Sequence, residues 1–327
     1  MKQYDVITSG YVSMDHIIRI NRPAAVGYTS LIENKTNSKI YYGGCSVNIA
    51  YALCRLGLLA MPVIRVGDDY EQTGFRNFLR EGGVPEEGVS VVEGENTSCC
   101  YLIEDNEGQH ITLFYPGAMD GRYAAPLPDE FFASARLGVI TVASHADNRL
   151  FFDGCIRHGV PVVFGMKADS TAFPEPFLKE LLLGSEIIFT NAEERRYIEG
   201  LLGLETIAGL LTVGKAKVII TTYGKQGSSY TRLLDDGGIE TRCIPVCDCT
   251  CVEDTTGSGD GYMAGFLYAY LRGLPMADCC RMGSTLSSFI IEKEGCCTNA
   301  PDADALCERY KSFLQCCSIE TEENETT

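Results

Sequence analysis

Residues 252–273, VEDTTGSGDGYMAGFLYAYLRG, decide the fold of this 327-residue chain. They predict a strand that ends near Val252, a glycine loop over 256–259, and an apolar helix that ends at Gly273. Glycines let the backbone approach a ligand closely, and the free amides at a helix N-terminus bind anions. Asp260 adds a carboxylate in the first helical turn. An anion hole with a general base and a plain turn with Asp260 as its N-cap fit this loop equally well.

Strand and helix patterns alternate over most of the rest of the chain. Short β-rich runs occur at 137–143, 160–164, 187–190 and 217–222, and helical patterns lie at 148–158 and 192–202. The first part of the chain repeats the theme, with a strand at 4–8, a helix at 46–56 and a strand at 61–66. This alternation predicts an α/β fold: a doubly wound, mainly parallel sheet with helices on both faces.

Two segments, 11–42 and 89–115, interrupt the alternation. The second contains runs at 89–92, 98–104 and 110–115, the last two joined by an Asp-Asn-Glu-Gly turn that indicates a hairpin. We predict that both segments form a small β-sheet lid over an α/β domain made of 1–10, 43–88 and 116–319. The acidic end, 320–327, is expected to be a disordered tail. The open edge of the lid sheet also suggests a homodimer through the lid.

The composition narrows the range of partners. Asp and Glu number 44 against 27 Lys and Arg, which gives a net charge of −17. An acidic surface repels phosphate backbones and anionic lipid, so nucleic acid and membranes are not expected as partners. No apolar run approaches the roughly 20 residues of a membrane span, and the N-terminus lacks the pattern of a signal peptide. We therefore expect a cytoplasmic protein.

The sixteen cysteines are interpreted as reduced, buried hydrophobic side chains. Four of the sixteen, Cys243, Cys247, Cys249 and Cys251, raise the alternative of a zinc site. A spacing of two in a strand would place the last three in a row, roughly 7 Å apart. A tetrahedral site needs all sulfurs about 2.3 Å from one ion, so zinc is disfavoured.

Two further segments bear polar side chains at places where ligands bind. Gly43 and Gly44 precede the predicted helix 46–56, and Asn48 lies in its first turn, where its amide could contact a polyol. Asp15 follows the first strand, at the edge where open α/β sheets bind ligands. An ordinary loop-to-helix entry and a solvated turn aspartate are the alternatives.

Taken together, these segments resemble the ribokinase-like (phosphofructokinase-B type) family of carbohydrate and nucleoside kinases over nearly the whole chain. The family's C-terminal signature is matched by 254–260 (DTTGSGD), and its N-terminal signature by Gly43, Gly44 and Asn48. Residues 191–194 (NAEE) match its Asn-x-x-Glu, and 222–227 (TYGKQG) match its Thr-x-Gly-x-x-Gly nucleotide loop. Residues 114–119 (FYPGAM) look more like the adenosine-kinase-like branch.

The resemblance implies an ATP-dependent kinase that transfers the γ-phosphoryl group to a hydroxymethyl group of a small sugar or nucleoside. It implies Mg²⁺ as a cofactor and, in many members, K⁺. Asp260 would be the general base, and the amides of Gly257, Ser258 and Gly259 the anion hole. The remaining implied contacts are Asp15, Gly43, Gly44 and Asn48 for the acceptor; Asn191, Thr222, Gly224, Gly227 and Asn299 for the nucleotide; Glu194 for Mg²⁺ through water; and Asp254 with Thr256 for part of a monovalent cation site.

Two other functions fit the residues less well. A catalytically silent sugar- or nucleotide-binding protein on the same fold could have lost its base, whereas this chain keeps Asp260. A nicotinamide dehydrogenase needs a glycine fingerprint after the first strand, and residues 10–15 (GYVSMD) do not supply it. Lys167, at the end of the predicted strand 160–165, is either a phosphate contact or a solvated lysine.

Overall fold

The computed structural model describes residues 3–325, and for 316–325 it describes only the backbone. In this part of the chain a nine-stranded sheet has the order β13-β12-β11-β10-β9-β8-β1-β4-β5. Strands β12 and β13 are antiparallel to their neighbours, and the other neighbouring pairs are parallel. The strands are β1 (Tyr4–Ser9), β4 (Ala60–Gly67), β5 (Val89–Val92), β8 (Ala135–Ile140), β9 (Val162–Gly165), β10 (Ile187–Asn191), β11 (Val218–Thr222), β12 (Ser228–Leu233) and β13 (Ile239–Ile244).

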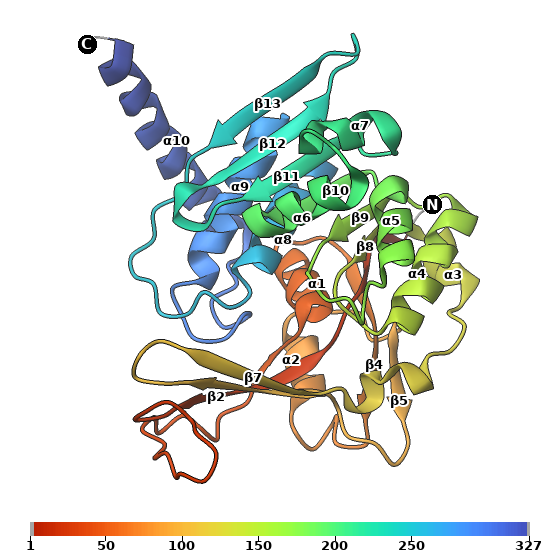
Figure 1. Cartoon of the computed structure of the whole chain (residues 1–327), viewed down its shortest axis with the longest axis vertical. Coiled ribbons are helices and arrows are strands. Elements are labelled where there is room, and N and C mark those ends of the chain that lie inside the picture. The colour runs from red at the N-terminus through yellow and green to blue at the C-terminus, as the bar shows by residue number, and fades with distance from the viewer. Residues whose placement is uncertain (1–2, 326–327) are drawn as a thin grey trace.

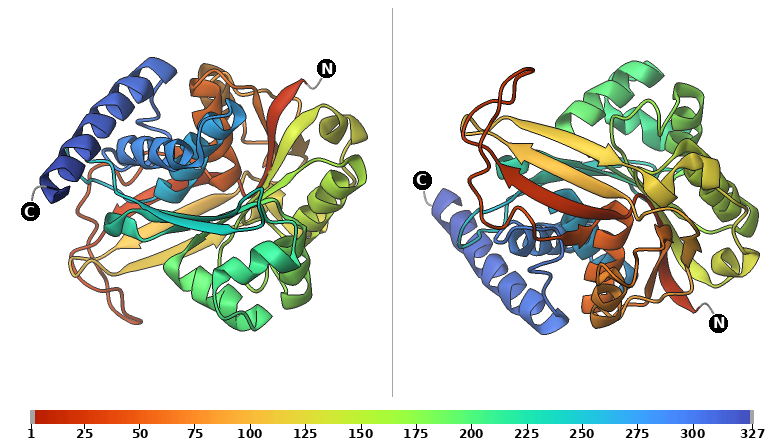
Figure 2. Two further views of the ribbon diagram at one scale, coloured as in Figure 1. Left: turned by 90° about the horizontal axis from the view of Figure 1, so that it is seen from above. Right: turned by 90° about the horizontal axis from the view of Figure 1, so that it is seen from below.

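Helices cover both faces of this sheet, which confirms the predicted fold class (Figures 1 and 2). Successive strand residues point to opposite faces, so Val6 packs in one core and Ile7 in the other. The helices on the Val6 face are α1 (Cys45–Arg55), α2 (Phe75–Glu81), α8 (Ser258–Leu271), α9 (Met276–Ile290) and α10 (Ala303–Glu325). The helices on the Ile7 face are α3 (Asp129–Ala133), α4 (His145–His158), α5 (Glu175–Gly184), α6 (Ala192–Leu202) and α7 (Leu210–Val213). Short 3₁₀ turns complete the fold: η1 (Gly117–Met119), η2 (Gly121–Tyr123), η3 (Ile207–Gly209) and η4 (Gly224–Gln226).

A separate four-stranded sheet forms the lid, at the bottom of Figure 1. Its order is β3-β2-β6-β7, with β2 at Ser13–Arg19, β3 at Tyr41–Gly43, β6 at Cys99–Glu104 and β7 at His110–Tyr115. The predicted hairpin is present, because β6 and β7 pair antiparallel from Cys99↔Tyr115 to Glu104↔His110. Strand β2 pairs with β6, so the two segments that interrupt the alternation do join in one sheet.

Two strand assignments need correction. β5 was predicted as part of the lid, but it pairs in parallel with β4 at the edge of the main sheet. It follows α2 and completes a βαβ unit, so the chain returns to the lid only after residue 92. The strand predicted to end at Val252 is absent from the described structure, since β13 ends at Ile244.

The segment that follows β13 is held by hydrogen bonds to the two residues just after α9 instead of by a strand ladder. The amide of Thr250 donates to Glu292 Oε1 at 2.8 Å, and that of Glu253 donates to the Ile291 carbonyl at 2.8 Å. Cys247, Cys249 and Cys251 therefore do not form the row that was expected of them. No group of three or more His, Cys, Asp or Glu side chains able to hold a metal occurs among the described residues.

Three further findings concern the whole described chain. Every cysteine whose side chain is described is a free thiol. None of the described helices is both long and apolar enough to cross a membrane. Helix α10 continues to Glu325, whereas disorder was expected from residue 320, and residues 326–327 lie outside the described part. Glutamate is a good helix former, which accounts for helix in an acidic segment.

Candidate active site

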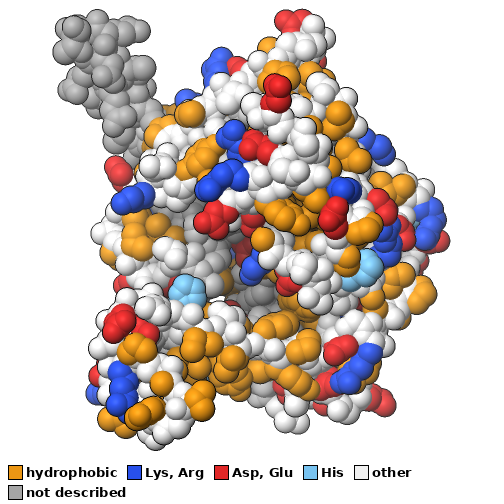
Figure 3. All heavy atoms as spheres, viewed as in Figure 1, with side chains coloured by type: hydrophobic (Ala, Val, Ile, Leu, Met, Phe, Trp, Pro, Cys, Tyr) orange, Lys and Arg blue, Asp and Glu red, His pale blue; other side chains and the backbone are white. Residues whose placement is uncertain are grey.

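A cavity of about 690 Å³ lies between the lid and the carboxyl edge of the main sheet. Residues at or just after five parallel strands line it: Tyr11, Thr141, Lys167, Asn191 and Thr222. This edge is where open α/β sheets bind ligands, and β1 is the strand where the chain order reverses. In Figure 3 the same face of the molecule is visibly hollowed.

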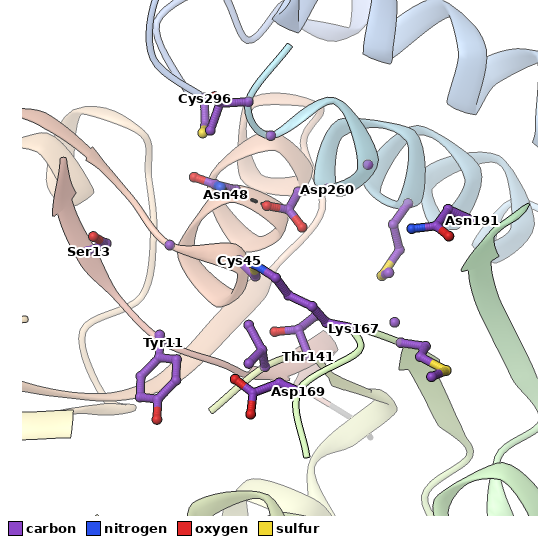
Figure 4. A pocket seen from close by; sticks show the side chains of 18 of the residues that line it. Tyr11, Ser13, Cys45, Asn48, Thr141, Lys167, Asp169, Asn191, Asp260 and Cys296 are labelled. Atoms are coloured by element: carbon purple, nitrogen blue, oxygen red, sulfur yellow. Dashed lines mark hydrogen bonds between the residues drawn. The ribbon is translucent and has the colours of Figure 1, made fainter. Parts of the chain in front are cut away.

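Asp260 and Asn48 face each other in this cavity from the first turns of two different helices (Figure 4). Asn48 Nδ2 donates a hydrogen bond to Asp260 Oδ2 at 2.8 Å. The contact joins α1 to α8 across 212 positions of sequence. It therefore brings together the two signatures that lie at opposite ends of the chain.

The environment of Asp260 suits a carboxylate that exchanges a proton near neutrality. Desolvation in the cavity wall raises the pKa of Asp260 to about 6, against the opposing effects of the Asn48 hydrogen bond and the Lys167 charge. At pH 7 the group is mainly ionised and can accept a proton. A general base is most effective when its pKa lies near the working pH.

Asp15 reaches the cavity from the lid side. It lies on β2, and its Oδ1 accepts a hydrogen bond from Ser13 Oγ. Desolvation raises the pKa of Asp15 to about 6, and the charges of Asp254 and Asp260 add to the rise. Gly44 lines the cavity beside it with φ +92°, and a side chain there would meet the Tyr11 carbonyl at 2.2 Å. The absence of a side chain at Gly44 thus allows the segment between β1 and β2 to pack closely against the start of α1.

The glycine loop before α8 presents three amides without a protein partner. Gly257 is the N-cap of α8, with φ +76° and no capping side chain. Among the described residues, the amides of Gly257, Gly259 and Asp260 have no hydrogen-bond acceptor, and all three residues line the cavity. Ser258 differs from the expectation for it, because its amide donates to the Thr255 carbonyl at 3.2 Å and its Oγ contacts Ser287.

Asn191 and Glu194 form a capping box at the start of α6. Asn191 Oδ1 accepts from the amides of Glu193 and Glu194 at 2.8 and 2.9 Å, and Glu194 Oε2 accepts from the Asn191 amide at 2.8 Å. Both side chains line the cavity, as does Thr222 at the end of β11. Desolvation raises the pKa of Glu194, while Lys167 opposes the rise.

Several expected site residues lie outside the cavity lining. Gly43 approaches the site only indirectly, since a side chain there would meet Asn48 Oδ1 at 2.7 Å. Gly224 and Gly227 shape the turn after β11 with positive φ. Asn299 Nδ2 donates hydrogen bonds to the Phe289 carbonyl at 2.7 Å and to Glu292 Oε2. Asp254 accepts the amides of Thr256 and Gly295 at 2.9 and 3.2 Å, whereas Thr256 itself lines the cavity.

Lys167, for which the sequence left a phosphate contact and a solvated lysine open, lines the cavity and extends toward Asp260 from the loop after β9 (Figure 4). The structure also adds cavity residues that the sequence patterns did not select. They include Tyr11, Cys45, Asp169, Cys296 and, on the inner face of the lid, Cys100, Leu102, His110, Thr112 and Phe114. The lid residues could have been found from the alternation along the hairpin once its inner face was known.

Comparison with known proteins gives a consistent result. The model of the pfkB family of carbohydrate kinases matches residues 5–303. A nucleoside kinase of Methanothermobacter thermautotrophicus is 30% identical over 94% of this chain and 95% of its own length. A nucleoside kinase of Methanocaldococcus jannaschii is 27% identical over 95% of this chain and 98% of its own. The crystal structure of a Methanocaldococcus jannaschii nucleoside kinase superposes with a TM-score of 0.85, at 25% identity, over 95% of this chain and all of that chain.

The raised pKa of Asp260 makes a prediction about stability. An aspartate whose pKa is higher in the folded than in the unfolded chain binds its proton more tightly when folded. The free energy of unfolding then falls as the pH rises from about 4 to about 6. Asp260→Asn should therefore be more stable than wild type at pH 7.5, by about 1–3 kcal/mol, and the gain should shrink toward zero near pH 4.

Urea denaturation at the two pH values measures this difference. Glu308→Gln, which neutralises an exposed carboxylate on α10, is the control and should change stability by less than about 0.5 kcal/mol at either pH. An Asp260→Asn gain of equal size at both pH values would show that ionisation of Asp260 is not its cause.

Proposed function

The chain belongs to the pfkB family of carbohydrate kinases, enzymes that transfer a phosphoryl group to an alcohol, and we propose that its acceptor is the hydroxymethyl group of a nucleoside, with ATP as donor. The observation that carries this proposal is Asp260, a carboxylate with a pKa of about 6, raised by desolvation, in the cavity between the lid and the main sheet. A small sugar is the alternative acceptor for the same reaction.

The proposed reaction is a direct transfer. Asp260 accepts the proton as the O–H bond of the acceptor breaks, and the acceptor oxygen forms a bond to the γ-phosphorus. The bond from that phosphorus to the β–γ bridging oxygen breaks, and ADP leaves with the electron pair. Asp15, ionised above its pKa of about 6, which desolvation raises, accepts hydrogen bonds from acceptor hydroxyls and so orients the attacking oxygen.

Charge that develops on the phosphoryl group would meet donors from two sides. The partnerless amides of Gly257, Gly259 and Asp260, at the N-terminus of α8, form the anion hole in this proposal. Lys167 lies across the cavity, where its charge acts on both Asp260 and Glu194. We assign it to the phosphoryl group in transfer, because it is the lysine that lines the cavity.

The implied Mg²⁺ fits the residues present. Glu194 lines the cavity, and while its Oε2 is bound to the Asn191 amide, its Oε1 has no partner among the described residues. Glu194 would hold Mg²⁺ through water, and the ion would neutralise phosphate charge. The implied K⁺ fits less well, since both oxygens of Asp254 already accept backbone amides, and we derive no step through it.

Two observations favour a nucleoside over a free sugar. The relatives named above that match nearly the whole chain, at 30% and 27% identity, are nucleoside kinases. In addition, Phe114 of the lid and Tyr11 pack with ring centroids 4.8 Å apart and their planes tilted by 58°, and both line the cavity. The two rings offer aromatic surface against which a nucleobase could pack and which a bare ribose would leave uncovered.

ADP release with a panel of nucleosides and free sugars tests the function, with Asp260→Asn as the mechanistic variant. We expect turnover with at least one nucleoside at saturating ATP and Mg²⁺. Asp260→Asn should lower kcat by about 10²–10⁴-fold, with nucleotide affinity unchanged, because the isosteric amide cannot take the proton. If sugars react and nucleosides do not, the acceptor assignment is wrong. If the variant keeps more than about a tenth of wild-type kcat with chemistry rate-limiting, Asp260 is not the base.

Gly259 offers a clean test of the anion hole. A side chain at 259 would meet no protein atom within 4 Å, so Gly259→Val should fold normally. It should nonetheless lower kcat by about 10²–10³-fold, because the side chain would stand beside a free amide in the space that the phosphoryl group needs. Gly200→Val, at a similarly open glycine on α6, is the matched control and should have wild-type kinetics. Wild-type kinetics in Gly259→Val would show that the loop is a turn without a role in transfer.

We also propose that the lid pairs with a second copy of the chain. The face of the lid turned away from the cavity presents apolar side chains: Tyr101, Ile111, Leu113 and Tyr115, each at least 40% exposed. Leu113→Asp should convert a dimer to a monomer in sedimentation velocity, since a charge would be buried at the contact. Val213→Asp, an exposed apolar position on α7, should leave the dimer intact. A wild-type monomer at all concentrations would disprove the pairing.

A further inference from the structure

A buried thiol lies directly behind the amide that contacts Asp260. Cys297 Sγ is 3.4 Å from Asn48 Oδ1, and each of the two residues is only 6% exposed. Asn48 Nδ2 in turn donates to Asp260 Oδ2 at 2.8 Å. Cys297, Asn48 and Asp260 thus form a chain of hydrogen bonds that ends on the carboxylate at the reacting centre.

The donors and acceptors along these hydrogen bonds allow only one orientation of the Asn48 amide. The side-chain amide of Asn48 has a donor end and an acceptor end, and a flip would exchange them. An ionised Asp260 can only accept, so it needs the donor end. Burial raises the pKa of the Cys297 thiol, and the nearby charges of Asp260 and Asp15 raise it further. The thiol therefore stays protonated and donates to the acceptor end.

The local packing agrees with this arrangement. A side chain on Gly43 would meet Asn48 Oδ1 at 2.7 Å, so glycine at 43 leaves room for the oxygen to face the thiol. If the amide flipped, Oδ1 would be set against the Asp260 carboxylate and two acceptors would repel each other. A thiol bond is weak, but here it selects between two orientations, one of which is repulsive.

We propose that Cys297 is a positioning residue for the transfer reaction, in that its thiol fixes the Asn48 amide in the orientation that holds Asp260. This inference rests on the proposed role of Asp260 as base. Cys297 itself contacts no reacting atom, because it is absent from the cavity lining and acts through Asn48.

These hydrogen bonds predict a change of defined sign in the pH dependence of kcat when Cys297 is replaced. The Asn48 hydrogen bond lowers the pKa of Asp260, so its loss should raise that pKa and move the acid limb of kcat to higher pH. The other titratable groups that face Asp260 remain in place in a Cys297 variant: Cys45, which hydrogen-bonds Asp260, Lys167, Asp15 and Cys296. A shift of the limb therefore reports on the altered residue.

The experiment compares pH profiles of kcat for Cys297→Val and Cys297→Ser. Valine has a similar volume but no donor, and we expect its acid limb to lie about half to one pH unit above that of wild type. Serine keeps a donor and should restore the wild-type limb. Cys297→Ala replaces the valine variant if the latter does not fold.

A matched control and a double variant separate positioning from packing. Cys279 is fully buried and donates to the Leu274 carbonyl at 3.4 Å in the helical core, so Cys279→Val removes a similar thiol bond away from the site. Its acid limb should not move. Cys297→Val added to Asn48→Ala should produce no further shift, because the thiol has then lost the amide through which it acts.

An unmoved limb in Cys297→Val, with kcat lowered equally at every pH, would overturn the inference, as would additive shifts in the double variant. Asp260→Asn, measured in parallel, distinguishes failure of the Asp260 proposal from failure of the Cys297 inference. An acid limb that persists in Asp260→Asn would refute Asp260 as base and the Cys297 inference with it. A limb that disappears there but is unmoved in Cys297→Val would refute the Cys297 inference alone.

Discussion

The hydrogen bond between Asn48 and Asp260 is the constraint around which the site is built. It joins the first turns of α1 and α8, two helices that each begin at a glycine with positive φ and without a capping side chain. Two uncapped N-termini thus point at one cavity and supply a positive potential. This matters in a chain of net charge −17, where an anionic nucleotide must be drawn to a molecule that repels it at long range.

The same cavity concentrates negative charge, and the balance between the two sets its chemistry. Asp15, Asp260 and Glu194 lie within it, and desolvation raises the pKa of each. Lys167 opposes the rise for Asp260 and Glu194. The empty cavity therefore holds unfavourable charge, because the Asp15 and Asp260 carboxylates repel each other. In the proposed function, a bound nucleotide with its cation and the acceptor hydroxyls would offset this repulsion. The desolvated carboxylates thus lower the stability of the empty protein, which is typical of reactive sites.

Much of the fold could be predicted because its signals are local. Buried parallel strands are short β-rich runs, and helix α6 begins with the Asn191–Glu194 capping box and was placed at its observed bounds. Prediction was wrong where two structures share one local pattern. The run 89–92 is β-rich in either sheet, and only its long-range pairing with β4 decides between them. Residues near Val252 look like a strand, but the Glu292 side chain and the Ile291 carbonyl, just after α9, accept the hydrogen bonds that a neighbouring strand would have accepted.

The candidate site was predicted as far as its residues lie on glycine and acid motifs. The motifs did not show that the Ser258 amide donates a hydrogen bond within the loop. Nor did they show that the Asn299 amide donates to the Phe289 carbonyl and to Glu292. They also missed Cys297, since one cysteine among sixteen has no distinguishing pattern. Such roles depend on which atoms meet in space, which motif spacing does not encode.

The lid sheet has one further consequence, for how such a protein can change over time. His110, Thr112 and Phe114 face the cavity, while Ile111, Leu113 and Tyr115 alternate with them on the opposite face. The residues that we propose for the transfer itself, among them Asp260 and Lys167, come from the main domain. Substitutions at every second position of β7 can therefore alter which molecule is admitted while the outer surface and the reaction chemistry stay as they are. A change of substrate and the retention of the proposed mechanism thus fall on different elements: the first on the inner positions of β7, the second on the loops of the main domain.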